Sequence, residues 1–212
     1  MSLGASSPVR AVCWDWNGTL LDDVEICRAV MSRVLVSYGL PPLADLASYR
    51  RAFRFPIPDF YADVGLDAAV YRDAADQYLR WLAECIGDAE LHVDALHTLD
   101  GLAGRGVRQV LASATLPEAL ARQMLPHAIE DRFEAVLTIA DAFRASKHGA
   151  IEDWLAVSGL EPHDVLMVGD TNHDHEIADA LGCRFVHFDG GHQRAPRGVR
   201  RIGALKELHA LL

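Results

Sequence analysis

The sequence predicts an α/β fold, in which helices flank a parallel sheet and a small helical cap is inserted after the first strand. Short apolar runs alternate with helical patterns, which is typical of parallel sheets covered on both faces. The first two runs are separated by far more residues than one strand–helix–strand unit needs, and most of this interval has a helical pattern. With 212 residues, the chain is long enough for one such domain and a small insertion.

Five apolar runs are the candidate strands of the sheet. They are Val9–Trp14, Val107–Ala112, Ala135–Ile139, Val165–Val168 and Arg184–His187. The helical patterns between and after them are Pro117–Met124, His148–Val157, Glu176–Leu181 and Ala204–Leu211. Proline at an early helical position and glycine directly after the last residue support two of these helices, at Pro117 and Gly182.

About 90 residues separate the first run from the second, where a simple strand–helix–strand unit takes about 30. Val24–Tyr38 and Ala68–Cys85 are long helical patterns within this interval, and an aromatic- and arginine-rich stretch lies between them. We therefore predict a cap at residues 22–91 and a core formed by residues 1–21 and 92–212. The alternative is one overlong loop, which compact domains rarely contain.

Composition restricts the possible partners. The formal net charge of −10 argues against nucleic-acid binding, which needs a basic surface. No apolar run approaches the ~20 residues that span a bilayer, and residues 1–10 lack a signal-peptide core. Four cysteines without metal-type spacing are typical of reduced thiols, so we expect a cytoplasmic protein. The oligomeric state has no signature in the sequence.

The first strand leads into Asp15, and Gly18 with Thr19 then ends it. Open parallel sheets bind ligands beyond the carboxyl ends of their strands, which is where this carboxylate is expected. A carboxylate at that position can attack phosphorus and form an aspartyl-phosphate. Taken alone, a string of Asp, Asn and Gly is more often an ordinary turn.

Two more residues are candidates at later strand ends. Ser113 ends the second core strand, so its hydroxyl and the N–H of Ala114 can hold a phosphate oxygen. The alternative is a serine that satisfies loop backbone groups or caps the helix near Pro117. Lys147 precedes the helix His148–Val157 and can neutralise a carboxylate and a phosphoryl group. The alternative is an ordinary solvated lysine. The chain has only one other lysine, Lys206, so a lysine at this place is stronger evidence for a functional role than it would be in a lysine-rich chain.

Acidic residues follow the fourth run. Asp170 and Asp174 lie four residues apart at a strand-to-helix turn, and together with Asp15 they form a cluster that is costly without a cation. Oxygen ligands of this kind suit magnesium, which keeps several waters and binds few carboxylates. The alternative is that Asp170, Thr171 and Asp174 only cap the following helix, which explains one of the two acidic residues better than both.

Asp15, Ser113, Lys147 and the Asp170/Asp174 pair, in this order at successive strand ends, resemble the four motifs of the haloacid dehalogenase (HAD) superfamily. The resemblance covers essentially the whole chain, and the position of the insertion is similar to that in the phosphoglycolate phosphatase-like branch. It implies a Rossmann-like core, Mg²⁺ dependence and a phospho-aspartyl intermediate on Asp15. Within these motifs Thr19 and Ala114 are expected at the substrate. The metal is expected on Asp15, the backbone carbonyl of Asn17 and Asp170, with Asp174 as a further candidate ligand.

Asn17 departs from this pattern. HAD phosphatases typically carry an aspartate two residues after the nucleophile, and this aspartate protonates the leaving group and then activates water. An amide has no proton to exchange near neutral pH, although the backbone carbonyl remains a possible ligand. Either turnover is slow, or another group supplies the proton; the candidates are Asp22, Asp23, His173 and His192.

Two sibling activities fit less well. Phosphonoacetaldehyde hydrolase resembles this chain in the tryptophan after the nucleophile, but that reaction needs a cap lysine, and residues 22–91 contain none. The 2-haloacid dehalogenases need no metal and use a tyrosine that is absent here. The main prediction is a hydrolase of a small phosphomonoester. A non-catalytic phosphometabolite-binding protein and a dehalogenase-like hydrolase of another bond remain as alternatives.

The predicted cap carries an anion-friendly stretch with Arg50, Arg51 and Arg54 among several aromatic residues. Arginine pairs with phosphate and carboxylate and stacks on rings. We expect Arg51 and Arg54 to bind a small phosphorylated metabolite, whereas Arg50 fits a solvated helix face at least as well.

Overall fold

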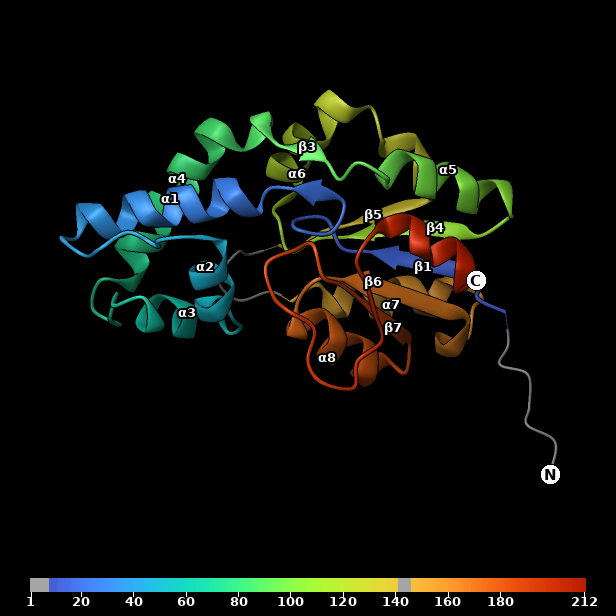
Figure 1. Ribbon diagram of the computed structural model, residues 1–212. Helices are drawn as coiled ribbons and strands as arrows, with labels where there is room; N and C mark the ends of the chain where they lie inside the picture. The colour runs from blue at the N-terminus through green and yellow to red at the C-terminus, as the bar shows by residue number, and fades with distance from the viewer. Residues whose placement is uncertain (1–7, 141–145) are drawn as a thin grey trace.

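A six-stranded parallel sheet forms the centre of the molecule. The computed structural model describes residues 8–140 and 146–212, and Figure 1 shows the sheet beside a group of helices from the first half of the chain. The strand order is β5-β4-β1-β6-β7-β8, so the first strand is central and the predicted fold class is confirmed. The strands are β1 (Ala11–Trp14), β4 (Arg108–Ala112), β5 (Ala135–Leu137), β6 (Val165–Gly169), β7 (Arg184–Phe188) and β8 (Arg201–Ile202).

Alternate residues of β1 face opposite layers of helices. Val12 and Trp14 pack into one apolar cluster with α5 (Ala95–Gly104), α6 (Pro117–Met124) and the C-terminal 3₁₀ helix Leu205–Ala210. Ala11 and Cys13 pack into a second cluster with α7 (Lys147–Ser158) and α8 (Asn172–Leu181). Because successive strand side chains point to opposite faces, a fully buried apolar strand is what a sheet covered on both sides requires. Figure 1 shows the two layers above and below the sheet.

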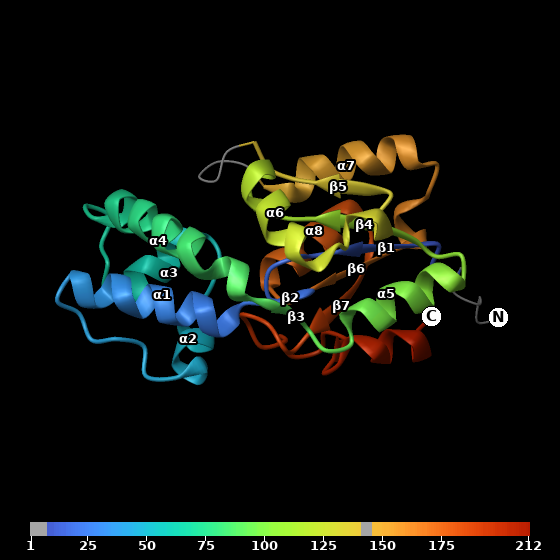
Figure 2. The same ribbon diagram turned by 90° about the horizontal axis from the view of Figure 1, so that it is seen from above.

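Four helices form a separate unit beside the carboxyl ends of the strands (Figure 2). They are α1 (Val24–Ser37), α2 (Leu46–Ala52), α3 (Ile57–Asp63) and α4 (Tyr71–Cys85), and we call them the helical unit. The unit has its own apolar cluster, which includes Met31, Tyr49 and Phe60. It therefore has an interior distinct from the two that flank the sheet. No helix among the described residues is long and apolar enough to cross a membrane.

A short antiparallel ribbon joins the helical unit to the sheet. Strand β2 (Leu21–Asp22) pairs with β3 (Glu90–Leu91), with Leu21 opposite Leu91. The chain leaves the core along one strand of this ribbon and returns along the other. The cap boundaries at residues 22 and 91 remain a prediction, since the ribbon adjoins both parts.

Several elements differ from the patterns read in the sequence. Helix α8 begins four residues earlier than Glu176 because Thr171 caps it: the Thr171 hydroxyl accepts a hydrogen bond from the Asp174 N–H, and the Asp174 carboxylate accepts one from the Thr171 N–H. Such a reciprocal cap satisfies otherwise unpaired N–H groups at a helix start. The C-terminal segment is a 3₁₀ helix and not an α-helix. Helices α2, α3 and α5 and strand β8 were not predicted.

Candidate active site

Asp15 follows β1 directly, at the carboxyl end of the central strand. The Lys147 ammonium lies 2.5 Å from Asp15 Oδ1 and 2.6 Å from Asp174 Oδ1. It also donates to the carbonyl oxygen of Ala112, 3.3 Å away at the end of β4. Lys147 is the first residue of α7, and Ser146 caps that helix. One buried lysine therefore joins the ends of β1 and β4 to the start of α8.

Three carboxylates form an acidic cluster here, and Lys147 contacts two of them. Asp15, Asp170 and Asp174 each offer an oxygen, and these oxygens all lie within 4.8 Å of one another. Thr19 is fully buried and donates towards Asp15 at 3.3 Å and Asp170 at 3.1 Å. The structure therefore brings together Asp15, Thr19, Lys147, Asp170 and Asp174 as the sequence predicted. Asp174 both caps α8 and pairs with Lys147, whereas Asp170 accepts hydrogen bonds from the Thr19 hydroxyl and the His192 N–H.

The ionisation of these groups reflects an excess of negative charge. Burial would lower the pKa of Lys147, but the Asp15 and Asp174 carboxylates raise it above its ordinary value. Burial raises the pKa of Asp15 well above its usual range despite Lys147, and burial also raises the pKa of Asp170. Lys147 keeps the pKa of Asp174 low against burial. The positive charges of Lys147 and His192 thus leave the pKa values of Asp15 and Asp170 raised, and a bound metal would relieve this excess of negative charge.

The donor set fits a hard divalent cation such as Mg²⁺, because it consists of carboxylate oxygens. The loops around Asp170 leave no room for side chains. A Cβ at Gly18 would lie 2.5 Å from an Asp170 oxygen, and one at Gly191 would lie 2.0 Å away. Gly18 also has a φ of +74°, which favours glycine. The predicted contribution of the Asn17 carbonyl remains a prediction.

Ser113 and Ala114 lie at the end of β4. Ser113 is buried, and its hydroxyl accepts a hydrogen bond from the Thr115 N–H at 3.1 Å. Ala114 is exposed. The serine therefore satisfies a backbone N–H of its own turn, which is one of the two alternatives, and it directly follows β4, the strand next to β1. Its contact with a substrate oxygen remains a prediction.

The Asn17 side chain is fixed from three directions. Its amide donates to Asp23 Oδ2 at 2.8 Å and to Gln123 Oε1 at 3.4 Å, and its oxygen accepts from the Thr115 hydroxyl at 2.9 Å. Sequence reasoning missed Thr115 and Gln123, for which no motif or spacing gave a signal. Asp23 was one of four candidates for a proton donor, and it is the one that contacts Asn17.

Asp23 also pairs with His192, another of those candidates. Asp23 is fully buried, and its Oδ1 lies 3.5 Å from His192 Nε2. The other ring nitrogen of His192 lies 2.9 Å from the Tyr49 hydroxyl of α2, and its backbone N–H donates to Asp170 at 2.5 Å. Burial would lower the pKa of His192, but Asp23 raises it to about 9. This chain of contacts connects the helical unit to the acidic cluster.

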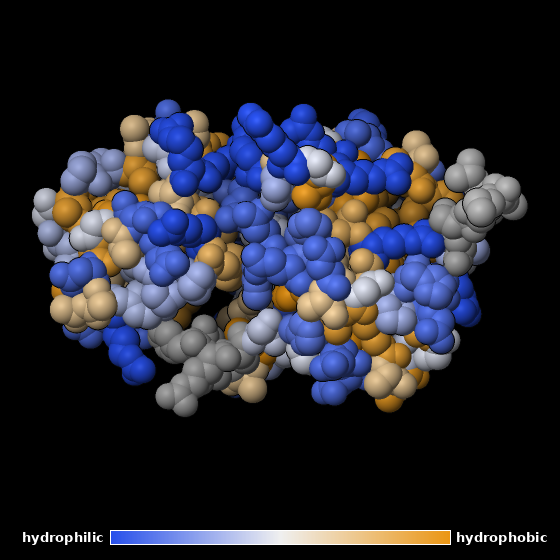
Figure 3. Space-filling view, turned by 90° about the horizontal axis from the view of Figure 1, so that it is seen from below, coloured by the Kyte–Doolittle hydropathy of each residue, from blue (hydrophilic) through white to orange (hydrophobic). Residues whose placement is uncertain are grey.

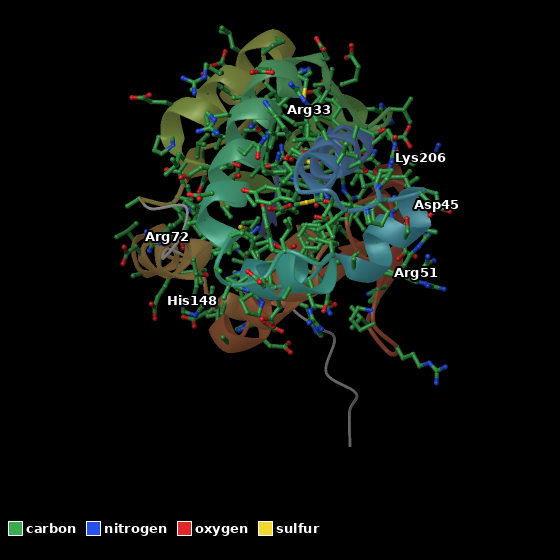
Figure 4. The ribbon with its side chains drawn as sticks, turned by 90° about the vertical axis from the view of Figure 1, so that its left-hand side faces the viewer. Arg33, Asp45, Arg51, Arg72, His148 and Lys206 are labelled. Carbon is green, nitrogen blue, oxygen red and sulfur yellow. The ribbon has the colours of Figure 1, made fainter. Side chains whose placement is uncertain are left out.

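Of the other two candidates, Asp22 is exposed and His173 stacks on Phe55, with ring centroids 4.7 Å apart. Arg51 and Arg54 lie elsewhere. They line a cavity between α2 and the loop that carries Gln193 and Arg194, and none of the acidic cluster, Lys147 or Ser113 lines it. Figure 4 shows Arg51 on the same edge of the helical unit as Asp45 and on the opposite side from Arg72. The Arg54 guanidinium pairs with Asp63 at 2.8 Å.

A known family of hydrolases matches most of this chain. The family model of haloacid dehalogenase-like hydrolases matches residues 12–188, which include every residue of the acidic cluster. The chain belongs to this family. The predicted family and the prediction of a hydrolase are thereby confirmed, whereas the role of each site residue stays a prediction.

The relatives of this HAD hydrolase fall into two groups by name. Phosphoglycolate phosphatase of Rhodospirillum rubrum is 29% identical over 212 residues, covering 92% of this chain and 85% of that protein. Tyrosine-protein kinase PtkA of Mycobacterium tuberculosis is 31% identical over 202 residues, covering 90% of this chain and 67% of that protein.

Solved structures also superpose over nearly the whole chain. The structure of PtkA matches with a TM-score of 0.82 and 24% identity, covering 98% of this chain and 99% of that one. A predicted phosphatase from Clostridium acetobutylicum also matches with a TM-score of 0.82, at 19% identity, covering 97% of this chain and 98% of that one. At these identities the structural matches establish the fold alone.

Proposed function

We propose that this chain is a Mg²⁺-dependent phosphatase that hydrolyses a small phosphomonoester through an aspartyl-phosphate on Asp15. The observation that carries the proposal is the contact of Lys147 with both Asp15 and Asp174 at the carboxyl end of β1, with Asp170 beside them. A nucleophilic carboxylate and a cation-binding pair are thus within reach of one phosphoryl group. The name of the Rhodospirillum relative, a phosphoglycolate phosphatase, supports this class of substrate.

Each group of the site has a separate role in the proposed reaction. Asp15 attacks phosphorus, and the ester oxygen departs as the aspartyl-phosphate forms. Lys147 offsets negative charge on the nucleophile and on the phosphoryl oxygens, while Ser113 and the Ala114 N–H hold one of those oxygens. Mg²⁺ bound by Asp15, Asp170 and Asp174 would supply charge neutralisation and orientation of the phosphoryl group. Water then hydrolyses the aspartyl-phosphate and regenerates Asp15.

The proton step is where this chain differs from the family pattern. Asn17 cannot carry a proton, but its amide donates to the buried Asp23 carboxylate. A carboxylate is therefore present one hydrogen bond away from position 17. The helical unit supports the enclosure of the site, because Tyr49 reaches His192, which contacts both Asp23 and Asp170. Closure of such a unit over a site excludes water from the reaction.

A screen of phosphomonoesters with and without Mg²⁺ tests the proposal, with phosphoglycolate and p-nitrophenyl phosphate among the substrates. Activity is expected only with Mg²⁺, and Asp15→Asn should reduce it to below about 1% because the amide is not a nucleophile. Asp59→Asn, an exposed aspartate of α3, is the matched control and should leave activity unchanged. Substantial activity in Asp15→Asn, or full activity in excess chelator, would contradict the covalent, metal-dependent mechanism.

A further inference from the structure

A cavity of about 470 Å³ lies between α2 and the loop after β7. Four arginines are among its lining residues, in a chain whose net charge is −10. The lining residues are Ala47, Arg50, Arg51, Phe53, Arg54, Asn172, Gln193 and Arg194. Figure 3 shows strongly hydrophilic side chains along the boundary between the helical unit, on its left, and the core.

Two of the four arginines already have partners. The Arg50 guanidinium donates to the carbonyl oxygens of Gly191 at 2.7 Å and Gly190 at 2.6 Å. Arg54 pairs with Asp63. These contacts fix the two side chains, and the Arg50 contacts also hold α2 against the loop. Carbonyl groups carry no formal charge, so the charge of Arg50 is not neutralised by them.

The other two arginines, Arg51 and Arg194, have no carboxylate within ion-pair distance among the described residues, and both are exposed. Burial, and then the positive charge of Arg194, lower the pKa of Arg50. The cavity therefore gathers like charges that repel one another. An anion placed between them would relieve this repulsion, and guanidinium groups bind phosphate and carboxylate through paired N–H donors.

The cavity shares a wall with the acidic cluster but does not open among its carboxylates. Phe53 stacks on His192 with ring centroids 4.9 Å apart, and the His192 N–H donates to Asp170. Gln193 closes the same wall, because its amide donates to the Phe53 carbonyl at 2.9 Å and its oxygen accepts from the Asn172 N–H at 2.6 Å. An anion in this cavity is thus distinct from the phosphoryl group that reacts at Asp15.

We propose that this cavity is a second oxyanion site, which binds a phosphate or carboxylate group of a small metabolite between Arg51 of α2 and Arg194 of the loop. The two arginines come from the helical unit and from the core, so a bound anion holds the two parts together. The oxyanion belongs either to a separate metabolite or to the far end of a long substrate. Arg51 thus keeps its predicted role as a ligand of a small metabolite, whereas Arg54 lines the cavity and pairs with Asp63.

The first test is calorimetric titration of the full-length, Mg²⁺-loaded protein with sodium sulfate at constant ionic strength. Arg194→Gln and Arg51→Gln should each weaken sulfate binding by at least about fivefold, since each removes a charged hydrogen-bond donor. Arg72→Gln and Arg197→Gln change the net charge equally at exposed positions outside the cavity and should stay within about twofold of the parent. Equal affinity in all four variants would overturn the proposal.

The second test separates the two sources of the oxyanion. If the group belongs to the substrate, Arg194→Gln should raise KM for a sugar bisphosphate at least about fivefold and leave KM for p-nitrophenyl phosphate unchanged. If it belongs to a separate metabolite, sulfate should change the turnover of both substrates in the parent and in neither with Arg194→Gln. The calorimetric result stands without any turnover, so failure of the proposed phosphatase activity remains distinguishable from failure of this site.

Discussion

Lys147 is the cation that contacts two carboxylates of the acidic cluster, Asp15 and Asp174, and its side chain is only 4% exposed. Its removal leaves Asp15 and Asp174 without their partner in a site from which water is largely excluded. Breaking a buried ion pair by deleting one member is strongly destabilising, because the remaining charge is neither solvated nor paired. The lysine is therefore expected to matter for folding as well as for chemistry.

Lys147→Met should lower the free energy of unfolding by about 3 kcal/mol in excess chelator. Added Mg²⁺ should recover part of this loss, because the cation replaces the missing positive charge. Lys206→Met is the matched control, since the chain's other lysine is 61% exposed and pairs loosely with Asp94. It should cost less than about 1 kcal/mol. Chemical denaturation of both variants measures the difference, and equal losses would contradict the buried ion-pair argument.

Asn17 and Asp23 can be exchanged to test the proton carrier. Asp23→Asn should lower kcat by roughly 10²-fold towards alkyl phosphates if Asp23 serves this role. Asn17→Asp alone places a second carboxylate against Asp23, whose Oδ2 now lies 2.8 Å from the Asn17 amide nitrogen, so the repulsion opposes any gain. The double variant Asn17→Asp/Asp23→Asn keeps one carboxylate and one amide and should restore kcat to at least ~10-fold above Asp23→Asn.

Steady-state kinetics with alkyl and aryl phosphates distinguish the outcomes of that exchange. Aryl leaving groups need less protonation, so all these effects should be smaller for p-nitrophenyl phosphate. If Asp23→Asn retains full kcat, another residue carries the proton. A double variant that folds and binds Mg²⁺ but stays as slow as Asp23→Asn would mean that a carboxylate at position 17 cannot protonate the leaving group in this chain.

At the scale of secondary structure, the N-terminal cap of a helix positions one of the acidic residues. The reciprocal cap between Thr171 and Asp174 begins α8, and the same Asp174 carboxylate meets Lys147. A second reciprocal cap, between Asp45 and Ser48, begins α2 on the surface. The two caps have the same local chemistry, but only one includes a residue of the acidic cluster.

Thr171→Ala and Asp45→Ala should each lower the free energy of unfolding by about 1 kcal/mol, which is typical of a lost helix cap. Only Thr171→Ala should also reduce phosphatase activity, by about tenfold, because the Asp174 carboxylate loses the hydroxyl that donates to it at 2.6 Å. Thermal unfolding and kinetics on p-nitrophenyl phosphate measure the two effects. Comparable activity losses in both variants would mean that α8 capping has no special role.

The sequence predicted the strands of the core better than the ends of its helices. A buried parallel strand such as β1 is a continuous apolar run, and this signal does not depend on distant residues. The start of α8 depends on how Thr171 and Asp174 pair, and α2 and α3 are short helices with little periodicity to read. Helix α5 has buried residues at helical spacing, but Gly101 and Gly104 interrupt its pattern and make a helix harder to predict from the sequence.

The acidic cluster was predictable because each member directly follows a strand or begins a helix in the parallel sheet. Topology brings such positions together whatever the details of packing. The environment of Asn17 was not predictable, since Gln123 lies on α6 and nothing in its local sequence points towards the first strand. The cavity around Arg51 could not be predicted either, because Arg194 follows α2 by more than a hundred residues in the sequence.

The whole molecule should respond to Mg²⁺ through its stability. Because the cluster of Asp15, Asp170 and Asp174 exists only in the folded chain, a cation bound there stabilises folding by mass action. At 100 times its Kd the ion should add about 2.7 kcal/mol to the free energy of unfolding. Asp170→Asn should abolish this gain with little change of shape, whereas Asp59→Asn should keep it. A Mg²⁺ effect that persists in Asp170→Asn would place the ion elsewhere.

The β2–β3 ribbon also bears on how this architecture tolerates change. Its two strands hold the ends of the segment 23–89 side by side, at roughly the 4.8 Å spacing of paired strands. Closing a loop between fixed, adjacent ends costs an entropy that grows only with the logarithm of loop length. The stability of the sheet is therefore nearly insensitive to the size of whatever lies between Asp22 and Glu90. Evolution can lengthen, shorten or exchange that segment, and so alter what the protein recognises, while the residues beneath it keep their places.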